Sequence, residues 1–493
     1  MWVRLSGFRL SRIMRLLRPL TLTCLLLWGA LAGFSGRAAP ARPAGSDGLP
    51  ATVAAALRQA QVPQDALSAV VLPVQGADAR LAWHGEAMRN PASVMKLVTT
   101  YAALELLGPA YTWQTPVYVQ GTLRDGTLKG QVYIRGQGDP KLVAERLWLM
   151  LRRLQGQGVR HIDGDIVLDR SAFSVTARDP GDFDDEPWRP YNVAPDALLV
   201  NFNALTLNFI PDVAAGIARI AFEPPMIHLQ IPGSVPLAPE QAACGDWRAG
   251  LQADFSQTGR IVLAGSYPSA CGERLWSAAP ADPQGFAARA IEGMWRALGG
   301  TLTGVVRDGQ VPDHLQPVFS STSPTLAEVI RDINKYSNNV MAQQVLLTMG
   351  REQTGTGTLQ SARAVLDDWW RAHGGASAEL VMDNGAGLSR EGRVGAWALA
   401  RLLQQAWASP VMPELLASLP IIGVDGTLKR SQGRAHGAAH LKTGSLRDAA
   451  ALAGYVRGAS GRRYVLVALV NAPNAVASRP ALDALVDWVW ADQ

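Results

Sequence analysis

A serine and a lysine three positions apart, Ser93 and Lys96, are the residues of this sequence with the clearest potential for chemistry. On a helix that begins near Ser93, such residues lie on one face, so the two side chains can touch. A serine hydroxyl is a weak nucleophile at neutral pH and needs a nearby base. A lysine can be that base when burial or a neighbouring cation lowers its pKa. The pair therefore predicts nucleophilic catalysis, although a helix-capping serine beside a solvated lysine has the same spacing.

Two later motifs strengthen this interpretation. Ser337-Asn338-Asn339 and Lys442-Thr443-Gly444-Ser445 follow the first pair along the chain. Lys442 would supply the cation that lowers the pKa of Lys96. Each motif by itself is weak evidence for catalysis, because an ordinary turn or loop can have the same sequence. The three together, at a helix start, in a loop beside a helix and at a strand edge, resemble the SxxK, SDN and KTG set of class A β-lactamases and penicillin-binding proteins.

Over essentially the whole chain after its N-terminal segment, the sequence resembles the D-alanyl-D-alanine carboxypeptidase/endopeptidase family of low-molecular-mass penicillin-binding proteins. The 244 positions between Ser93 and Ser337 leave room for an inserted region that β-lactamases lack. The resemblance implies hydrolysis of D-Ala-D-Ala bonds and D-Ala-diaminopimelate cross-links in peptidoglycan stem peptides, and covalent binding of β-lactam antibiotics. The segments that carry it are Pro91–Lys96, Leu107–Pro109, Gly136–Pro140, Asp383–Arg390, Gly423–Leu428 and Lys442–Leu446.

The resemblance also implies catalytic roles for five residues. Ser93 would be the acylated nucleophile, and Lys96 would accept its proton. Ser337 would pass a proton to the leaving D-alanine, and Asn339 would bind the peptide backbone of the substrate. Lys442 would help to hold the terminal carboxylate and would keep the pKa of Lys96 low.

The strand that follows Lys442 would bind substrate through Thr443, Gly444 and Ser445. The N–H groups of Ser93 and Ser445 would form the oxyanion hole, because hydrogen-bond donors aimed at developing negative charge stabilise it.

Two further features of the resemblance concern the side chain of the substrate. Arg390 would bind a diaminopimelate carboxylate. A carboxylate of the inserted region would face the free amino group, and the run Asp182–Glu186 is its expected source. Within that run we take Asp184 and Asp185 as candidates, without deciding between them. A solvated acidic loop is an equally good explanation of most of this run.

The middle motif departs from the family pattern, because Asn338 stands where an aspartate is usual. The central residue is not the proton-transfer group, so we expect activity to survive. Tyr336-Ser337-Asn338 also fits the YxN motif of class C β-lactamases, and the sequence alone leaves that register open.

These motifs need a fold that brings distant segments together. The run Arg463–Val470 is nearly all apolar, as expected for a strand in a sheet covered on both faces. Helical apolar spacing occurs before and after it along the chain. We expect an α/β (α+β) domain of three layers, of the penicillin-binding/β-lactamase-like transpeptidase type. It is split in sequence into residues 42–112 and 286–493. Residues 113–285, where short β-like runs alternate with turn residues, are expected to form a mostly β insertion of one or two subdomains.

The N-terminal segment predicts export. Residues 1–41 contain six arginines and no acidic residue. Five of these arginines precede an apolar stretch from Leu20 to about Phe34, and small residues follow that stretch, as in a secretory signal peptide. We therefore expect a periplasmic protein. Peripheral attachment to the membrane by an uncleaved anchor is the alternative. Without this segment, 40 basic residues face 41 acidic ones, so the net charge of +5 gives no support to a nucleic-acid partner.

Cysteine usage agrees with an oxidising compartment. Cys24 lies in the apolar stretch, which leaves Cys244 and Cys271 as an even pair. We expect a disulfide between them, and two separate buried thiols are the alternative. With no HExxH or CxxC motif, we expect no metal and no cofactor.

Two other functions stay open at this point. A β-lactamase or esterase would share the serine chemistry but would need fast deacylation, and the long insertion argues against it. A catalytically silent cell-wall binding protein could keep the same fold. The intact Ser93, Lys96 and Lys442 argue against that alternative.

Overall fold

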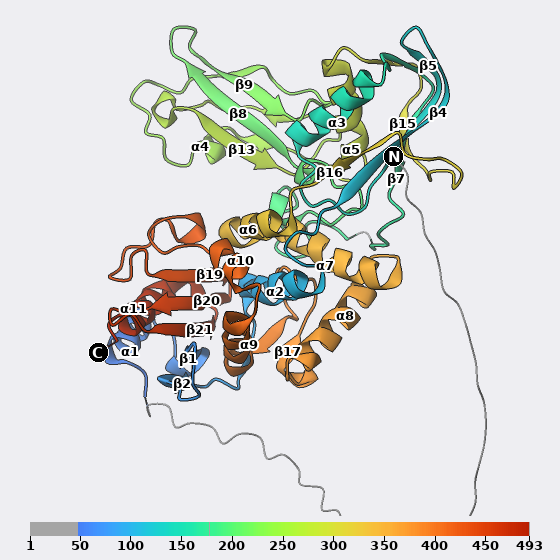
Figure 1. The fold of residues 1–493 in the computed structure, drawn as a ribbon. Helices are drawn as coiled ribbons and strands as arrows, with labels where there is room; N and C mark the ends of the chain where they lie inside the picture. Colours follow the sequence, from blue (N-terminus) through green and yellow to red (C-terminus); the bar gives the residue numbers. More distant parts are fainter. Residues whose placement is uncertain (1–47, 177, 493) are drawn as a thin grey trace, which may run out of the picture. The chain divides into compact units, whose positions relative to one another are not determined.

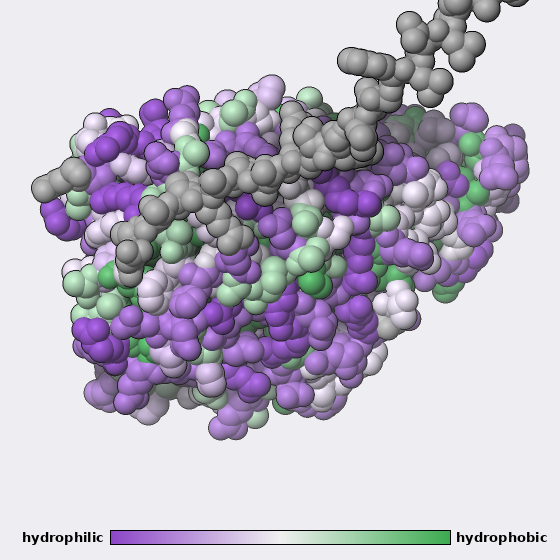
Figure 2. All heavy atoms as spheres, turned by 90° about the horizontal axis from the view of Figure 1, so that it is seen from below, coloured by the Kyte–Doolittle hydropathy of each residue, from purple (hydrophilic) through white to green (hydrophobic). Residues whose placement is uncertain are grey.

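The computed structural model describes residues 48–176 and 178–492, so the expected signal peptide lies outside the described residues. Figure 1 shows helices around a central sheet, and an inserted region with further sheets above α6 (Leu326–Tyr336) and α7 (Asn339–Thr354). Among the described helices, none combines the length and the apolar character needed to cross a membrane. On the face seen in Figure 2, hydrophilic residues predominate and apolar ones are scattered among them.

The central sheet is antiparallel and joins the two ends of the described chain. Its strand order is β19-β20-β21-β1-β2, so β1 pairs with β21. Strands β20 and β21 are buried along almost their whole length, which agrees with the expected cover on both faces. The strands are β1 (Leu67–Pro73), β2 (Leu81–Trp83), β19 (Ala439–Leu446), β20 (Ala449–Arg457) and β21 (Arg463–Asn471).

Alternate residues of β21 enter two separate hydrophobic clusters, because successive side chains point to opposite faces of a sheet. Leu466 and Val470 pack with apolar residues of α1 (Ala51–Gln59) and α11 (Arg479–Trp490). Val465 and Val467 pack in the other cluster with residues of six helices. These helices are α2 (Lys96–Leu106), α6 (Leu326–Tyr336), α7 (Asn339–Thr354), α8 (Leu359–Ala372), α9 (Ala396–Ala408) and α10 (Met412–Ser418). A small sheet of order β17-β18-β3 (Leu380–Val381, Arg393–Gly395, Met88–Arg89) completes this part.

The inserted region begins with a seven-stranded mixed sheet. Strands β4 and β5 form a hairpin, and β6 and β7 run parallel to β5. Helices α3 (Ala144–Gly156) and α5 (Phe286–Ala297) pack on this sheet in one hydrophobic cluster. The strands are β4 (Gln114–Arg124), β5 (Thr127–Arg135), β6 (His161–Asp163), β7 (Ile166–Asp169), β14 (Thr301–Leu302), β15 (Val306–Asp308) and β16 (Phe319–Thr322).

A second, four-stranded sheet of order β10-β9-β8-β13 forms the rest of the insertion. Its core holds the rings of Phe209 and Tyr267, stacked at 5.5 Å between centroids. Beside this core the sulfur atoms of Cys244 and Cys271 are 2.12 Å apart, the pairing that the sequence predicted. The elements are β8 (Leu205–Asp212), β9 (Ile217–Glu223), β10 (Ser234–Pro236), β13 (Arg274–Ala278), the pair β11 (Ala253–Asp254) and β12 (Val262–Leu263), and α4 (Trp247–Gly250).

The packing of α5 bears on where the insertion ends. We expected residues 286–493 to belong to the peptidase domain, but Ile291 and Trp295 of α5 lie in the cluster of the inserted sheet. Further along, β16 pairs with β4 of the same sheet. We therefore propose that the insertion extends to Thr322 and that it contains the helices α3, α4 and α5 besides its strands.

Candidate active site

Ser93 lies on a short turn that precedes a helix. The residues Ala92–Met95 form a 3₁₀ turn, and α2 begins only at Lys96. Ala92 has a left-handed backbone (φ 47°), and its N–H donates to Asn90 Oδ1 at 2.9 Å. Ser93 is partly exposed, while its neighbours on both sides are buried. The turn therefore exposes Ser93 to solvent, while its buried neighbours and the hydrogen bond from Ala92 to Asn90 fix the backbone of the turn.

The amino group of Lys96 has three close oxygen neighbours. Its Nζ lies 3.0 Å from Ser93 Oγ, 2.6 Å from Asn339 Oδ1 and 2.5 Å from the carbonyl oxygen of Ala386. The side chain is fully buried. This burial, and next the positive charge of Lys442, lower the pKa of Lys96 well below the ordinary lysine value.

The middle motif occupies the junction of α6 and α7. Ser337 ends α6 in a left-handed conformation (φ 59°), and its Oγ accepts a hydrogen bond from Lys442 Nζ at 2.9 Å. Asn338 caps α7 by accepting from the N–H of Met341 at 3.1 Å. Either asparagine or aspartate can cap a helix in this way, which gives a physical reason why Asn338 can stand at this position.

The register of the middle motif follows from these contacts. Ser337 lies next to Lys442, and Asn339 lies next to Lys96. Tyr336, the tyrosine of the alternative YxN register, has 71% of its surface exposed. The contacts therefore favour the Ser337-Asn338-Asn339 register.

Lys442 is the second fully buried lysine of the site. Besides Ser337, its Nζ donates to the carbonyl oxygen of Thr443 at 2.7 Å. Burial lowers the pKa of Lys442 to about 7. The Thr443 hydroxyl lies 2.8 Å from the hydroxyl of Thr427, in the Gly423–Leu428 segment.

Strand β19 passes close to the turn that carries Ser93. A Cβ atom added at Gly444 would lie 2.5 Å from the carbonyl oxygen of Pro91 and 3.1 Å from the Cβ of Ala92. Only glycine allows this approach. It brings β19 against the turn that carries Ser93, and Ser445, the residue after Gly444, is exposed.

The loop Asp383–Arg390 supplies the carbonyl that contacts Lys96. Asn384 holds this loop from within, since its Oδ1 accepts from the N–H of Ala386 at 3.0 Å and its Nδ2 donates to the carbonyl of Leu388 at 2.7 Å. Sequence reasoning identified Arg390 in this loop but missed Ala386, because a backbone carbonyl leaves no trace in residue type.

Arg390 contacts the inserted region and the turn between β19 and β20. Its Nη1 lies 3.1 Å from Asp448 Oδ1, and its Nη2 donates to the carbonyl oxygen of Phe183 at 3.3 Å. The guanidinium carbon lies 4.4 Å from the centre of the Phe183 ring. These contacts hold the arginine at the junction between the two parts of the chain.

The acidic run divides into residues that face a pocket and residues that do not. Asp184 accepts hydrogen bonds from Tyr191 Oη at 2.8 Å and from Asn192 Nδ2 at 2.7 Å, so its carboxylate holds the loop together. Asp185 is exposed and does not line the pocket. Asp182 does line it, beside Phe183 and Arg390.

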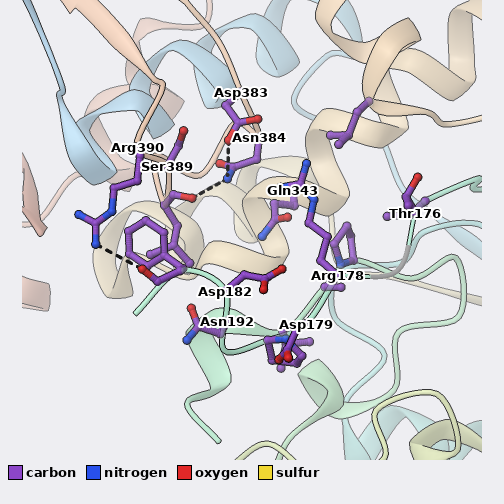
Figure 3. Close-up of a pocket in the computed structure, with 18 of the residues that line it drawn as sticks. Thr176, Arg178, Asp179, Asp182, Asn192, Gln343, Asp383, Asn384, Ser389 and Arg390 are labelled. Carbon is purple, nitrogen blue, oxygen red and sulfur yellow. Dashed lines mark hydrogen bonds between the residues drawn. The ribbon is translucent and has the colours of Figure 1, made fainter. Parts of the chain in front are cut away.

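The pocket itself has a volume of about 350 Å³. Figure 3 shows Arg390 on one side of it and Arg178 on the other, with Asp182 and Gln343 between them. Asn339 Nδ2 donates at 3.0 Å to the carbonyl oxygen of Tyr191, the residue before the lining residue Asn192, so the inserted loop that lines the pocket also contacts the site. In the described chain, no group of three or more His, Cys, Asp or Glu side chains could hold a metal ion.

The sequence matches the D-Ala-D-Ala carboxypeptidase 3 (S13) family over residues 49–491. The chain belongs to this family. It is 32% identical over 394 residues to the D-alanyl-D-alanine carboxypeptidase of Actinomadura sp. (strain R39), an alignment that covers 75% of this chain and 71% of that protein. It is 25% identical over 396 residues to the D-alanyl-D-alanine carboxypeptidase DacB of Haemophilus influenzae, covering 79% of this chain and 82% of that protein.

The solved structure of penicillin binding protein 4 (dacB) from Haemophilus influenzae has the same fold as this S13 chain. The two superpose with a TM-score of 0.69 at 22% identity, over 88% of this chain and 99% of the other. Both the predicted family and the predicted penicillin-binding type of fold are thus confirmed. The roles of individual residues in this S13 chain rest on the contacts described above.

Proposed function

We propose that this protein is a serine DD-peptidase. It hydrolyses the D-Ala-D-Ala bond of peptidoglycan stem peptides as a carboxypeptidase and the D-Ala-diaminopimelate cross-link as an endopeptidase, and β-lactam antibiotics acylate it. The observation that carries the proposal is the buried amino group of Lys96, 3.0 Å from the hydroxyl of Ser93. Family membership supports the same reaction.

Burial and the positive charge of Lys442 favour a neutral amine at Lys96. A neutral lysine has two N–H bonds and one lone pair. The amide oxygen of Asn339 and the carbonyl oxygen of Ala386 carry no hydrogen, so they take the two N–H bonds. The lone pair then faces Ser93 Oγ, whose hydroxyl can donate to it. In this arrangement Lys96 accepts the proton as Ser93 Oγ attacks the substrate carbonyl.

The groups around Ser93 would complete acylation. The N–H groups of Ser93 and Ser445 stabilise the oxyanion of the tetrahedral intermediate. Ser337 gives its hydroxyl proton to the leaving amine and takes a proton in return from the Lys442 ammonium, which donates a hydrogen bond to it. Water then hydrolyses the ester on Ser93 and regenerates the enzyme.

The same contacts suggest how the substrate is held. Asn339 and Gly444 bind its backbone, while Thr443 and Lys442 bind the carboxylate next to the scissile bond. Arg390 binds the carboxylate at the end of the diaminopimelate side chain. For its amino group we propose Asp182 rather than Asp184 or Asp185, because Asp182 lines the pocket beside Arg390.

The proposal includes export to the periplasm, where stem peptides are found. The signal-like segment 1–41 and the Cys244–Cys271 pair support it. The mass of the protein recovered from the periplasm tests this part: the N-terminal segment should be missing, and a full-length, membrane-bound protein would contradict it.

The decisive assay for the reaction is release of D-alanine from a diaminopimelate-containing pentapeptide. We expect release by the wild type and none by Ser93→Ala. Purified cross-linked muropeptides, with product identification, then test the endopeptidase activity. A wild type that releases no D-alanine and cleaves no cross-link, while keeping its fold, would contradict the proposal.

A further inference from the structure

The pocket beside Arg390 extends well beyond that residue. Its volume of about 350 Å³ is in the range that holds a whole small molecule rather than one side-chain end. The inserted loop around residues 175–195 lines one wall. The other wall is formed by Gln343 of α7 and by the loop 383–391. Arg178 lies across the pocket from Arg390 (Figure 3).

The guanidinium of Arg178 is free to take a ligand. Among the residues that the structure describes, none forms an ion pair or a hydrogen bond with its side chain, and Arg178 is exposed. The nearby carboxylate of Asp383 is occupied, because it pairs with Arg363. Asp179 accepts from the N–H of Gly181 at 2.8 Å. A guanidinium that lines a pocket in this way is suited to a planar anion such as a carboxylate.

Two chain segments run from the catalytic groups to the lining of the pocket, which contains none of the five catalytic candidates. The carbonyl of Tyr191, which Asn339 contacts, precedes the lining residue Asn192. The carbonyl of Ala386, which Lys96 contacts, belongs to the same loop as the lining residue Leu388. A peptide whose scissile bond lies at Ser93 can therefore extend its acyl-donor side into this pocket.

We propose that Arg178 binds a second carboxylate of an acidic stem peptide, the free α-carboxylate of a γ-linked glutamyl residue that precedes the diamino acid. This inference rests on the proposed function. The two arginines at opposite sides of the pocket match two carboxylates. Asp182 lies between them and matches the amino group that accompanies the first. The pocket would thus read two consecutive residues of the substrate.

Two synthetic pentapeptides test this inference, one with the glutamyl α-carboxylate and one with a carboxamide in its place. The enzymes are the wild type, Arg178→Gln, Arg178→Lys and the control Arg274→Gln, which alters an exposed arginine of β13 outside the pocket. We expect the wild type to prefer the carboxylate peptide by about 10-fold in kcat/KM, the size of a charge-assisted hydrogen bond.

Arg178→Gln should abolish this preference by raising KM for the carboxylate peptide, with kcat and the carboxamide peptide unaffected. Arg178→Lys should keep part of the preference for the carboxylate peptide, and Arg274→Gln should show the same preference as the wild type. Equal losses on both peptides, or an unchanged preference in Arg178→Gln, would overturn the inference while leaving D-alanine release, and so the proposed function, intact. A wild type that releases D-alanine from neither peptide would overturn the proposed function itself.

Discussion

Two buried lysines dominate the site at the scale of single residues. A lysine removed from water loses part of the hydration that stabilises its charge, so its pKa falls. Lys96 and Lys442 are both fully buried, and each lies beside a serine hydroxyl. The positive charge of Lys442 also disfavours a second charge on Lys96. The pair thereby provides a neutral base at Ser93 and a nearby group that can carry a proton.

The first prediction concerns pH. The acylation rate constant for benzylpenicillin should fall as the pH falls through the pKa of Lys96, because protonation removes the base. That midpoint should lie well below the usual lysine value of ~10.4. Lys442→Gln removes the neighbouring positive charge, so the pKa of Lys96 and the midpoint should move to higher pH, even though the rate itself drops. Stopped-flow or competition measurements between pH 5 and 10 check this.

The exposed Lys429 supplies the control, since Lys429→Gln also removes one positive charge. Its midpoint should match that of the wild type. If Lys442→Gln leaves the midpoint where it was, the lysines are not coupled as described.

A second prediction separates Asp182 from Asp184. Asp182→Asn should raise KM several-fold for a substrate with a free diaminopimelate amino group, with no change for an analogue that lacks the amine. Asp184→Asn should instead loosen the loop, because Tyr191 and Asn192 donate to that carboxylate. We expect Asp184→Asn to raise KM for both substrates by the same factor. Steady-state kinetics with the two substrates measure this difference, and the opposite pattern would return Asp184 to the substrate-binding role.

The sequence predicted Ser93, Lys96, Ser337, Asn339 and Lys442 because side-chain chemistry at fixed spacing is visible in residue types, and the structure brings all five together. The sequence could not predict the backbone carbonyls of Ala386 and Tyr191, which accept hydrogen bonds from Lys96 and Asn339. Nor could it choose within Asp182–Glu186, because that choice depends on how one loop folds back on itself.

At the scale of elements, close approach of backbones positions the nucleophile. The loop Asp383–Arg390 passes so near the turn of Ser93 that a Cβ atom at Gly387 would lie 1.9 Å from the carbonyl oxygen of Ala92. On the other side, Gly444 lets β19 approach the same turn. Glycines on both sides thus hold the turn in its place.

The third prediction tests this packing. Gly387 has a φ of 76°, and Gly374, which has open space around it, has a φ of 74°. Each change to alanine should cost about 1–2 kcal/mol of unfolding free energy for the left-handed backbone. Gly387→Ala should lose more than that and should acylate more slowly, since the methyl group displaces the turn. Urea denaturation and penicillin acylation measure both effects. Equal losses of stability, with normal acylation in both variants, would show that the contact does not matter.

Apolar patterns predicted most elements but not their partners. The run Arg463–Val470 is the central strand β21, as expected from its apolar character. Helix α5 begins at Phe286, the position from which we expected the chain to rejoin the peptidase domain, yet it packs on the inserted sheet. Amphipathic spacing shows that one face of a helix is buried, and it carries no information about what covers that face. Helix α3 was missed because the turn-rich texture around it favoured strands.

At the scale of the whole molecule, the insertion supplies part of the site. Tyr191 contacts Asn339, Phe183 contacts Arg390, and Arg178 lines the pocket. All three belong to the inserted region. The peptidase part of the chain thus provides the nucleophile and its base, while the insertion provides one wall of the pocket beside Arg390.

The fourth prediction concerns the stability of the insertion. A disulfide between Cys244 and Cys271 closes a loop with a sequence separation of 27 residues. Chain entropy then predicts that changing both cysteines to serine costs about 3 kcal/mol of unfolding free energy. Acylation by penicillin should be little changed, because the hydrophobic cluster around the pair contains none of the five catalytic candidates. Urea unfolding measures the loss. Two free thiols in the oxidised, purified protein would contradict the bond.

The central claim is that Ser93 forms the acyl-enzyme with Lys96 as its base. Peptide mass spectrometry after incubation with benzylpenicillin tests it most directly. We predict one adduct of the mass of the antibiotic, on the peptide that contains Ser93. It should be absent in Ser93→Ala and should form far more slowly in Lys96→Met. An adduct on any other residue, or equal labelling of Ser93→Ala, would contradict the claim.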